Sequence, residues 1–572
     1  MKKRKVFEYV KGLKVKGILA PLFKLFEAVL ELLIPLVIAD IIDNGIKNSD
    51  KNYIVVRFFF LVILAFVGYG FSITAQYFSS SVASKYSCRI RKGLFSHVQT
   101  LSFKDLDELG TSTLLTRITN DTNQIQTGVN MFLRLFLRSP FIVFGALVMA
   151  FIVDYQISLI FLGVIIVLSI IVVLIMNYTL PKYRKIQSSL DEVTRETKEN
   201  LTGVRVIRAF TGEEKQVEDF NQKNIKNTKL QIFVSKVSSL MNPLTYLVVN
   251  IGIILILYFG GLKVDTGSLT NGQVIALYNY INYILVELVK FANLVITITK
   301  SIASLKRVEQ IFNIEPSLNF KDGKKVEGPY LQFENVSFKY NDNGQEAVKN
   351  ISFSLKKNQT LGIIGGTGSG KSTLINLLGH NYDPTSGKII LDGYPLDSYD
   401  LVTLRNKIGF VPQKAVLFEG TIRSNLLWGN QNAKEEDLLE ALKISQSLDI
   451  VNGKEKGLDE KVEQGGRNFS GGQKQRLTIA RALVKKPEIL VLDDSSSALD
   501  FKTDKELRSA LRKLKNMTVI IISQRTSSLL DCDQILVLDH GELVSKGTHE
   551  ELMNSCSLYQ EIHYTQFEKE DN

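Results

Sequence analysis

Cysteine, histidine and tryptophan are scarce in this chain of 572 residues. The three cysteines (Cys88, Cys532 and Cys556) are too few for a disulfide framework and lack metal-ligand spacing. The five histidines are scattered, which argues against a zinc site. The basic start is not followed by a short apolar core with a small-residue cleavage site, so we expect no cleaved signal peptide. A disulfide-stabilised secreted protein and a zinc enzyme are both disfavoured.

No extreme of composition is present either. Hydrophobic residues make up 45% and charged residues 22%, which excludes disorder and collagen-like repeats. The mean hydropathy of +0.07 averages over the whole chain, so it can conceal an apolar half. Lys and Arg number 69 against 58 for Asp and Glu, giving a net charge of +11. This excess fits either nucleic acid or a membrane surface, and its distribution must decide between them.

Long apolar runs occur only in the first 300 residues. Each is long enough to cross a hydrocarbon core of about 30 Å as a helix. The clearest, Leu159–Met176, contains no charge. Buried helices of a soluble protein are the alternative, but six such runs in one half disfavour it. We therefore predict a six-helix transmembrane domain over residues 1–305, with spans near 18–42, 54–83, 130–153, 156–178, 240–264 and 273–300.

The connections between these runs indicate an orientation. Two are long, residues 84–129 and 179–239, and the others are short. Cytoplasmic segments of membrane proteins are enriched in Lys and Arg. We therefore expect a multi-pass protein of the cell membrane with both termini and both long connections in the cytoplasm. Orientation then accounts for the positive charge without nucleic acid, since the basic residues gather at Lys2, Lys3, Arg4, Lys5, Lys85, Arg89, Arg91 and Lys92.

Both long connections contain apolar residues at helical spacing. Residues 111–125 place Leu114, Ile118 and Ile125 near one face, and residues 196–210 show a similar pattern. An amphipathic helix on the membrane surface is the alternative interpretation. Polar residues 306–330, including Asp322 and Gly323, then form a linker to a second domain at 331–572.

This second domain alternates short strand-like and helical patterns, which predicts an α/β fold. Residues 365–372 match G-x-x-x-x-G-K-[ST] between an apparent strand and an apolar helix, the pattern of a phosphate-binding loop. Backbone N–H groups of such a loop wrap a phosphate at a helix N-terminus. Lys371 supplies positive charge and Ser372 a hydroxyl for Mg²⁺. The predicted ATP-binding residues are Gly365, Gly366, Thr367, Gly368, Ser369, Gly370, Lys371, Ser372 and Thr373.

A second apolar strand, Ile489–Leu492, ends in Asp493 and Asp494. An acidic residue at the end of a strand beside a phosphate loop is how nucleotide sites hold Mg²⁺. Alone this signal is weak, but it strengthens the phosphate-loop prediction.

Between these segments lies Asn468–Arg476, which contains Phe469-Ser470-Gly471-Gly472-Gln473. With this motif, nearly the whole chain resembles an ATP-binding cassette (ABC) half-transporter of the exporter type. The resemblance implies an all-α six-helix transmembrane domain followed by an α/β P-loop nucleotide-binding domain of ABC type. It also implies that this signature motif, including Gly472 and Gln473, caps ATP bound to a partner subunit. Phe469 stands where the family usually has Leu.

The resemblance assigns further positions. Tyr340 matches the aromatic residue that stacks on adenine, and Gln413 the glutamine that contacts Mg²⁺, with Ser372 and Asp493 as the other metal residues. Ser497 and Asp500 match the loop that joins the two ATP sites. Gly110–Ile125 and Glu199–Phe210 resemble the two coupling regions. Without the family, Tyr340 would be a packed strand residue and Gln413 a turn residue.

Two catalytic positions depart from the family pattern. Asp494 replaces the glutamate that orients water, and Gln524 replaces the histidine after the last core strand. A carboxylate displaced by about 1 Å can slow a reaction on the order of 100-fold, and Gln has no titratable charge. Together with Gln413, these are the expected catalytic residues. The departures imply a degenerate ATP site in a heterodimer, and a homodimer in which Asp494 suffices remains the alternative.

The leading functional hypothesis is an ATP-driven exporter subunit that moves amphipathic drugs or lipids outward. Its expected cofactors are ATP and Mg²⁺, and its expected partners are a second half-transporter, the lipid bilayer and a small amphipathic or lipid substrate, without nucleic acid. A dedicated peptide or lipid exporter and a nucleotide-gated regulatory membrane protein are alternatives. A DNA-repair ATPase would not explain six apolar spans. Charged residues within the spans are expected to face a cavity or a partner, and these are Glu27, Glu31, Arg134, Arg138, Glu287 and Lys290.

Overall fold

The structure, a computed structural model, describes residues 6–318, 320–321, 323–341, 344–514 and 516–567. Lys2, Lys3, Arg4, Lys5 and Asp322 lie outside the described residues. The chain folds as two compact units. One comprises Met1–Gln99 with Thr111–Glu315 and is called the helical unit here. The other comprises Thr100–Gly110 with Pro316–Asn572 and is called the α/β unit.

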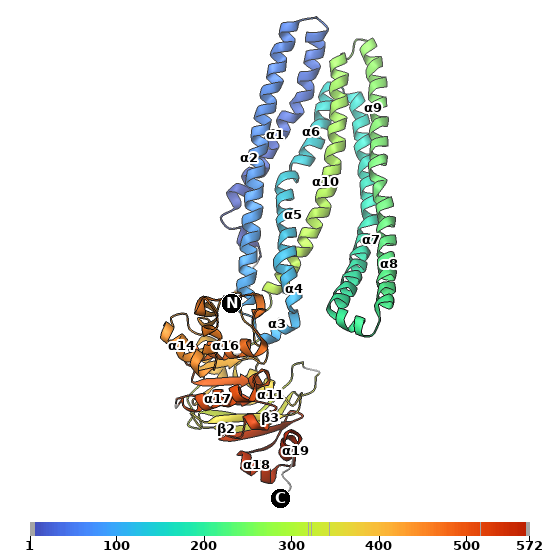
Figure 1. The fold of residues 1–572 in the computed structure, drawn as a ribbon. Helices are drawn as coiled ribbons and strands as arrows, with labels where there is room; N and C mark the ends of the chain where they lie inside the picture. Colours follow the sequence, from blue (N-terminus) through green and yellow to red (C-terminus); the bar gives the residue numbers. More distant parts are fainter. Residues whose placement is uncertain (1–5, 319, 322, 342–343, 515, 568–572) are drawn as a thin grey trace. The chain divides into compact units, whose positions relative to one another are not determined.

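The helical unit consists of long helices, among which α1 packs along α2, and α7 packs along α8 and α9 (Figure 1). Helix α7 contains 55 residues, which at 1.5 Å per residue gives about 80 Å, far more than a bilayer requires. The helices are α1 (Lys14–Asp40), α2 (Lys51–Val98), α4 (Thr111–Thr116), α5 (Thr122–Leu135), α6 (Arg138–Val153), α7 (Tyr155–Ala209), α8 (Glu213–Ser239), α9 (Met241–Asp265) and α10 (Asn271–Phe312).

Within the described residues, five helical stretches are long and apolar enough to cross a membrane. These stretches are Lys51–Val98, Thr111–Val153, Tyr155–Ala209, Glu213–Asp265 and Asn271–Phe312. The first of the six predicted spans also forms a helix, α1, but it differs from the others. Lys24, Glu27 and Glu31 interrupt its apolar stretch. It therefore depends on partners for these charges.

Helices α5 and α6 are separated by a break at residues 136–137, and Pro140 explains it. A proline ring clashes with the carbonyl four residues earlier, and proline has no N–H to donate. The core of the helical unit lies where α1, α6, α7, α9 and α10 meet. There the fully buried Tyr280 donates its hydroxyl to the carbonyl of Leu32 at 2.8 Å.

The α/β unit contains a four-stranded antiparallel sheet in the order β2-β1-β4-β5 and a six-stranded sheet in the order β12-β11-β3-β10-β9-β6. The larger sheet is parallel except for its edge strand β12. Strands β7 and β8 pair separately. The strands are β1 (Leu331–Phe338), β2 (Val348–Leu355), β3 (Thr360–Gly365), β4 (Ser386–Leu391), β5 (Tyr394–Pro395), β6 (Ile408–Val411), β7 (Gly420–Thr421), β8 (Lys461–Val462), β9 (Ile489–Asp493), β10 (Thr518–Ile522), β11 (Gln534–Asp539) and β12 (Glu542–Gly547).

Strands β9 and β10 are buried along their whole length, as near-continuous apolar runs in a parallel sheet should be. Because parallel strands end at the same edge, the residues that follow β3, β9 and β10 come together there. The helices are α11 (Lys371–Leu378), α12 (Leu401–Lys407), α13 (Ile422–Leu426), α14 (Glu435–Ile444), α15 (Leu448–Asn452), α16 (Gly471–Val484), α17 (Phe501–Arg512), α18 (His549–Ser555) and α19 (Ser557–Gln566).

Helix α3 (Phe103–Leu109) belongs to the α/β unit although the sequence around it belongs to the helical unit. Ser102 caps the helix, and the hydroxyl of Tyr382 donates to the carboxylate of Asp107 at 2.5 Å. The predicted coupling region Gly110–Ile125 is thus divided: Gly110 ends the segment that packs with the α/β unit, and Thr111–Ile125 folds as helix in the other unit.

Candidate functional site

The phosphate loop, residues 365–372, joins the carboxyl end of β3 to the start of α11. Gly368 and Gly370 have positive φ values of 81° and 94°, which glycine adopts without strain. A Cβ on Gly370 would lie 2.5 Å from the carbonyl oxygen of Ala347, so that position has no room for a side chain. Gly366, Thr367 and Gly368 are exposed. The loop therefore presents backbone to solvent at a helix N-terminus, an arrangement that suits an anion.

Lys371 is 9% exposed and is turned back over this loop. Its Nζ donates to the carbonyl oxygens of Gly365 at 2.9 Å and Gly366 at 2.6 Å, and to Oγ of Ser369 at 3.2 Å. Burial lowers the pKa of Lys371, although the carboxylates of Asp494 and Asp493 act in the opposite direction. Phosphate oxygens would satisfy this cation better than neutral carbonyls do, because a charge-assisted hydrogen bond is stronger.

Asp493 ends strand β9 and accepts a hydrogen bond at 3.2 Å from Oγ of Ser372. Burial raises the pKa of Asp493, opposed by the Ser372 hydrogen bond and by Lys371. The hydroxyl and the carboxylate thus face each other beside the phosphate loop, and both are oxygen ligands of the kind that Mg²⁺ prefers. Over the described part of the chain, no group of three or more His, Cys, Asp or Glu residues forms a metal site. A cation held by Ser372 and Asp493 would need phosphate oxygens to complete its shell.

Asp494 adopts the left-handed conformation, with φ of 44°, and its backbone N–H donates to the carbonyl of Ile522 at 3.0 Å. Nε2 of Gln413 donates to its carboxylate at 3.3 Å. Burial raises the pKa of Asp494, while hydrogen bonds from Gln413 and Ser497 and the charge of Lys371 lower it. Gln413 and Asp494 lie 81 positions apart in sequence, and the fold brings their side chains together.

Tyr340 lies beside the same loop. Its hydroxyl is 3.0 Å from Oγ1 of Thr373, and its ring meets the rings of Phe338 and Tyr382 edge to face. The side chain is 43% exposed. A half-exposed ring fixed at its hydroxyl can offer a face to a planar base.

The signature residues begin helix α16. Ser470 and Gln473 cap this helix reciprocally, with Ser470 Oγ accepting from the Gln473 N–H and Gln473 Oε1 accepting from the Ser470 N–H. Ser470 and Gly471 are exposed, whereas the Phe469 side chain is buried in the core. The exposed helix start can therefore receive an anion from outside the chain.

The remaining predicted residues have local roles. Ser497 Oγ donates to the backbone carbonyl of Asp494 at 2.8 Å, and a Cβ on Gly472 would lie 3.0 Å from the carbonyl of Ala498. The segment after β9 thus contacts both the backbone of Asp494 and the signature helix. Asp500 caps α17 by accepting from the N–H of Thr503 at 2.9 Å.

Gln524 follows strand β10 and is exposed. Its backbone carbonyl accepts a hydrogen bond at 2.7 Å from Nε2 of Gln566, in the last turn of α19. Sequence reasoning did not find Gln566, because no motif marks a single glutamine near the end of an amphipathic helix.

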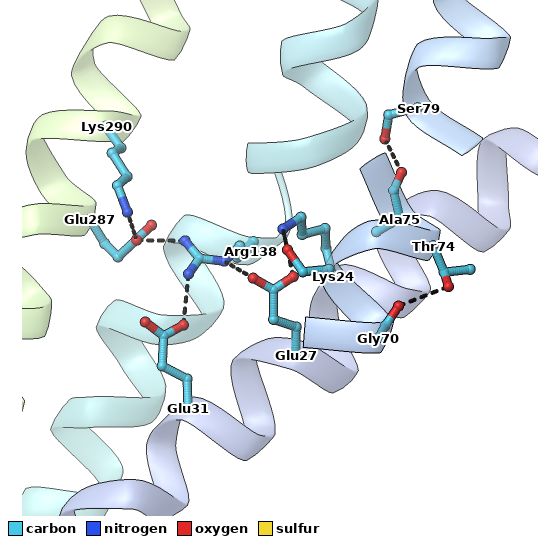
Figure 2. A network of polar contacts seen from close by, with 11 residues as sticks. Lys24, Glu27, Glu31, Gly70, Thr74, Ala75, Ser79, Arg138, Glu287 and Lys290 are labelled. Carbon is cyan, nitrogen blue, oxygen red and sulfur yellow. Dashed lines mark hydrogen bonds and ion pairs between the residues drawn. The ribbon is translucent and has the colours of Figure 1, made fainter. Parts of the chain in front are cut away.

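The helical unit contains a second group of polar residues, the charge network, centred on Arg138 (Figure 2). Arg138 is 2.6 Å from Glu287 and 2.7 Å from Glu31. Ser139 Oγ donates to the second oxygen of Glu287 at 2.7 Å. Lys290 pairs with Glu287 at 2.8 Å, and Lys24 pairs with Glu27 at 2.5 Å. The intramembrane charges of α1, α6 and α10 therefore neutralise one another, three acidic against three basic; Arg134 belongs to none of these pairs.

Comparisons with known proteins agree with this architecture. Residues 18–288 match the family described as ABC transporter transmembrane region, and residues 348–497 match the family described as ABC transporter. An uncharacterized ABC transporter ATP-binding protein of Bacillus subtilis (strain 168) is 34% identical over 569 residues, covering 99% of each chain.

Two further relatives extend the comparison. An ATP-dependent lipid A-core flippase of Photobacterium profundum is 29% identical over 534 residues, covering 92% of this chain and 90% of the relative. The solved structure of a bacterial Atm1-family ABC exporter with ATP bound shares the fold, with a TM-score of 0.83 at 23% identity over 98% of this chain and all of that one.

A transmembrane region fused to an ATP-binding domain with its phosphate loop and signature in place is the organisation of a half-transporter. ABC exporters act as dimers in a lipid bilayer, and their ATP-binding domains couple hydrolysis to transport. The chain is a member of the ABC transporter family, an exporter-type half-transporter with a multi-pass membrane domain.

Proposed function

We propose that this chain is the degenerate-site half of a heterodimeric exporter that moves amphipathic drugs or lipids out of the cell. The observation that carries the proposal is the pair Asp494 and Gln524 within an otherwise complete ATP site. Lys371, Ser372, Asp493 and Gln413 are all present and converge. Nucleotide binding is thus supported where fast hydrolysis is not.

The geometry of Asp494 gives a physical reason for slow turnover. Its side chain is one methylene shorter than that of the usual glutamate, and Gln413 already donates to it. Near-attack geometry is sensitive to displacements of about 1 Å, which can cost on the order of 100-fold in rate. Gln524 can donate a hydrogen bond to a phosphate oxygen but carries no titratable charge.

This chain's signature motif would complete the ATP site of the partner subunit. Ser470 and Gly471 lie exposed at the start of α16, where backbone N–H groups and the Ser470 hydroxyl favour an anion. A partner with its own glutamate and histidine would then hold the fast site. A homodimer in which Asp494 serves as the base remains the alternative.

Ser372, Gln413 and Asp493 are the proposed Mg²⁺ residues, on the grounds that their oxygens suit a hard cation. When bound, the ion would neutralise charge on the β- and γ-phosphates. Lys371 would hold the same phosphates, and Tyr340 would fix the adenine, so this chain's own residues orient the nucleotide.

The proposed cargo class is supported by two observations. The charge network is balanced, so it imposes no net charge on the cargo. Lipid A-core flippases are among the full-length relatives, which keeps a dedicated lipid exporter as the second candidate.

We place the protein in the cell membrane with both termini in the cytoplasm. Labelling of a cysteine introduced at Gly203 by a thiol reagent added outside intact cells would contradict this orientation.

The asymmetry is tested by two substitutions in the assembled transporter. Asp494→Asn removes a carboxylate from the slow site, so we expect total ATPase activity to fall less than twofold. Ser470→Arg places a bulky cation where the partner's γ-phosphate must bind, so we expect activity to be nearly abolished, a loss of about 100-fold. Equal and severe losses in both variants would reject the heterodimer and support a homodimer with working sites.

A further inference from the structure

The loop of residues 523–526 follows β10 and contains Gln524, and the structure anchors it at both ends. On its strand side, the Ser523 N–H donates to the carbonyl of Ile363 at 3.2 Å, and the carbonyl of Ile522 accepts from the Asp494 N–H. These bonds tie the start of the loop to β3 and the end of β10 to the backbone of Asp494. The far end of the loop is held by helix α19.

Gln566 contacts the backbone on both sides of Arg525. Its Nε2 donates to the carbonyl oxygen of Gln524 at 2.7 Å, and its Oε1 accepts from the N–H of Thr526 at 3.0 Å. One planar amide thereby fixes two successive peptide groups. His563, one turn earlier in α19, places Nδ1 at 3.0 Å from Oγ1 of the fully buried Thr526.

Helix α19 is fixed independently of these contacts. Tyr559 is fully buried, and its hydroxyl lies 2.8 Å from Nδ1 of His549. Leu552 and Cys556, also buried, belong to the same core cluster. The helix can therefore act as a rigid support for the loop, and we expect truncation of Gln566 to leave its docking intact.

The Gln524 side chain is exposed, and no hydrogen bond holds its amide within the described residues. Its place is therefore set by the backbone of the loop. We propose that Gln566, assisted by His563, is a positioning residue that holds Gln524 against the terminal phosphate of ATP at this chain's own site. This proposal rests on the function proposed for Gln524, and it makes helix α19 a support of the ATP site.

The experiment follows hydrolysis at this chain alone within the assembled transporter. The transporter is loaded with 8-azido-ATP labelled at either the α- or the γ-phosphate, cross-linked by light after increasing times, and this chain is isolated. Free nucleotide is removed before the time course, so that ADP released from the partner's fast site does not accumulate and rebind. The ratio of γ-label to α-label on this chain then follows cleavage at its own site. The concentration of azido-ATP that gives half-maximal α-labelling measures binding separately.

Gln566→Ala removes both backbone contacts, so we expect loss of γ-label to slow about tenfold while half-maximal labelling changes less than twofold, since loop placement affects chemistry more than binding. Gln566→Glu keeps an acceptor for the Thr526 N–H but has no donor for the Gln524 carbonyl. Its rate of γ-label loss should therefore lie between the wild-type rate and that of Gln566→Ala. Gln560→Ala is the matched control, because Gln560 lies on the same helix and donates to Met553 at 2.6 Å, away from the loop.

If Gln566→Ala loses γ-label at the wild-type rate, the proposal is overturned. It is also overturned if Gln560→Ala slows γ-label loss as much as Gln566→Ala does, because that would indicate a general effect of α19. If Gln566→Ala lowers the thermal stability, the rates of γ-label loss in Gln566→Glu and Gln560→Ala are compared instead. Slower loss in Gln566→Glu than in Gln560→Ala supports the proposal, and equal rates overturn it. Rapid γ-label loss in the wild type would reject the degenerate site but would leave the comparison among variants valid.

Discussion

Replacing Arg138 by methionine should destabilise the transporter far more than removing an ordinary surface cation. Arg138 is 9% exposed at its side chain, and its partner Glu287 is 3% exposed. Methionine fills similar volume but leaves Glu287 and Glu31 without the guanidinium. The change therefore isolates the loss of charge from the loss of packing.

The magnitude follows from what each carboxylate retains. Breaking a buried ion pair by removing one partner typically costs about 3–5 kcal/mol. Glu287 keeps Lys290 at 2.8 Å and the Ser139 hydroxyl at 2.7 Å, and Glu31 is 30% exposed to solvent. We therefore expect a loss near the lower limit, about 3 kcal/mol.

Thermal unfolding of the assembled transporter in lipid nanodiscs measures this loss. At about 1 °C per kcal/mol for a chain of this size, Arg138→Met should lower Tm by about 3 °C. Lys226→Met is the control, since Lys226 pairs with Glu192 at 3.3 Å while 63% exposed, and such pairs contribute at most about 1 kcal/mol.

A second substitution tests the cause. Arg138→Met combined with Glu287→Gln removes both buried charges and keeps an acceptor for Ser139, so it should recover much of the lost Tm. A Tm for Arg138→Met equal to that of Lys226→Met, or strictly additive losses in the double variant, would refute the reasoning.

Two further predictions concern the ATP site. Lys371→Ala should abolish photolabelling of this chain by ATP analogues, and Tyr340→Ala should weaken it about tenfold, since a stacked base contributes about 1–3 kcal/mol; unchanged labelling of Lys371→Ala would contradict the site. Because burial raises the pKa of Asp493, its ionised form costs the folded state free energy at every pH above its ordinary value of 3.8, so Asp493→Asn should raise Tm at pH 7 when nucleotide is omitted. That difference should shrink as pH falls toward 4, and a gap that widens on acidification would show that the sign is wrong.

Local sequence determined much of this protein. Apolar runs predict membrane helices because a bilayer requires about 20 apolar residues in succession, whatever surrounds them. The phosphate loop is equally local, since its glycines, Lys371 and Ser372 lie within eight consecutive residues. The signature at Ser470 caps its own helix. In each case the structure formed depends on residues that are close together in the sequence.

The tertiary structure decided what depends on residues distant in sequence. Arg138 and Glu287 are 149 positions apart, and no pattern in either helix indicates the other. The charges in α1 appeared as candidates for a cavity, and the fold showed that they are neutralised within the chain. Helix α3 joined the α/β unit through Tyr382, which lies 275 positions after Asp107. Gln566 reached Gln524 only because α19 packs against the turn that follows β10. Side-chain pairing over such separations is set by packing, and packing is a property of the folded chain.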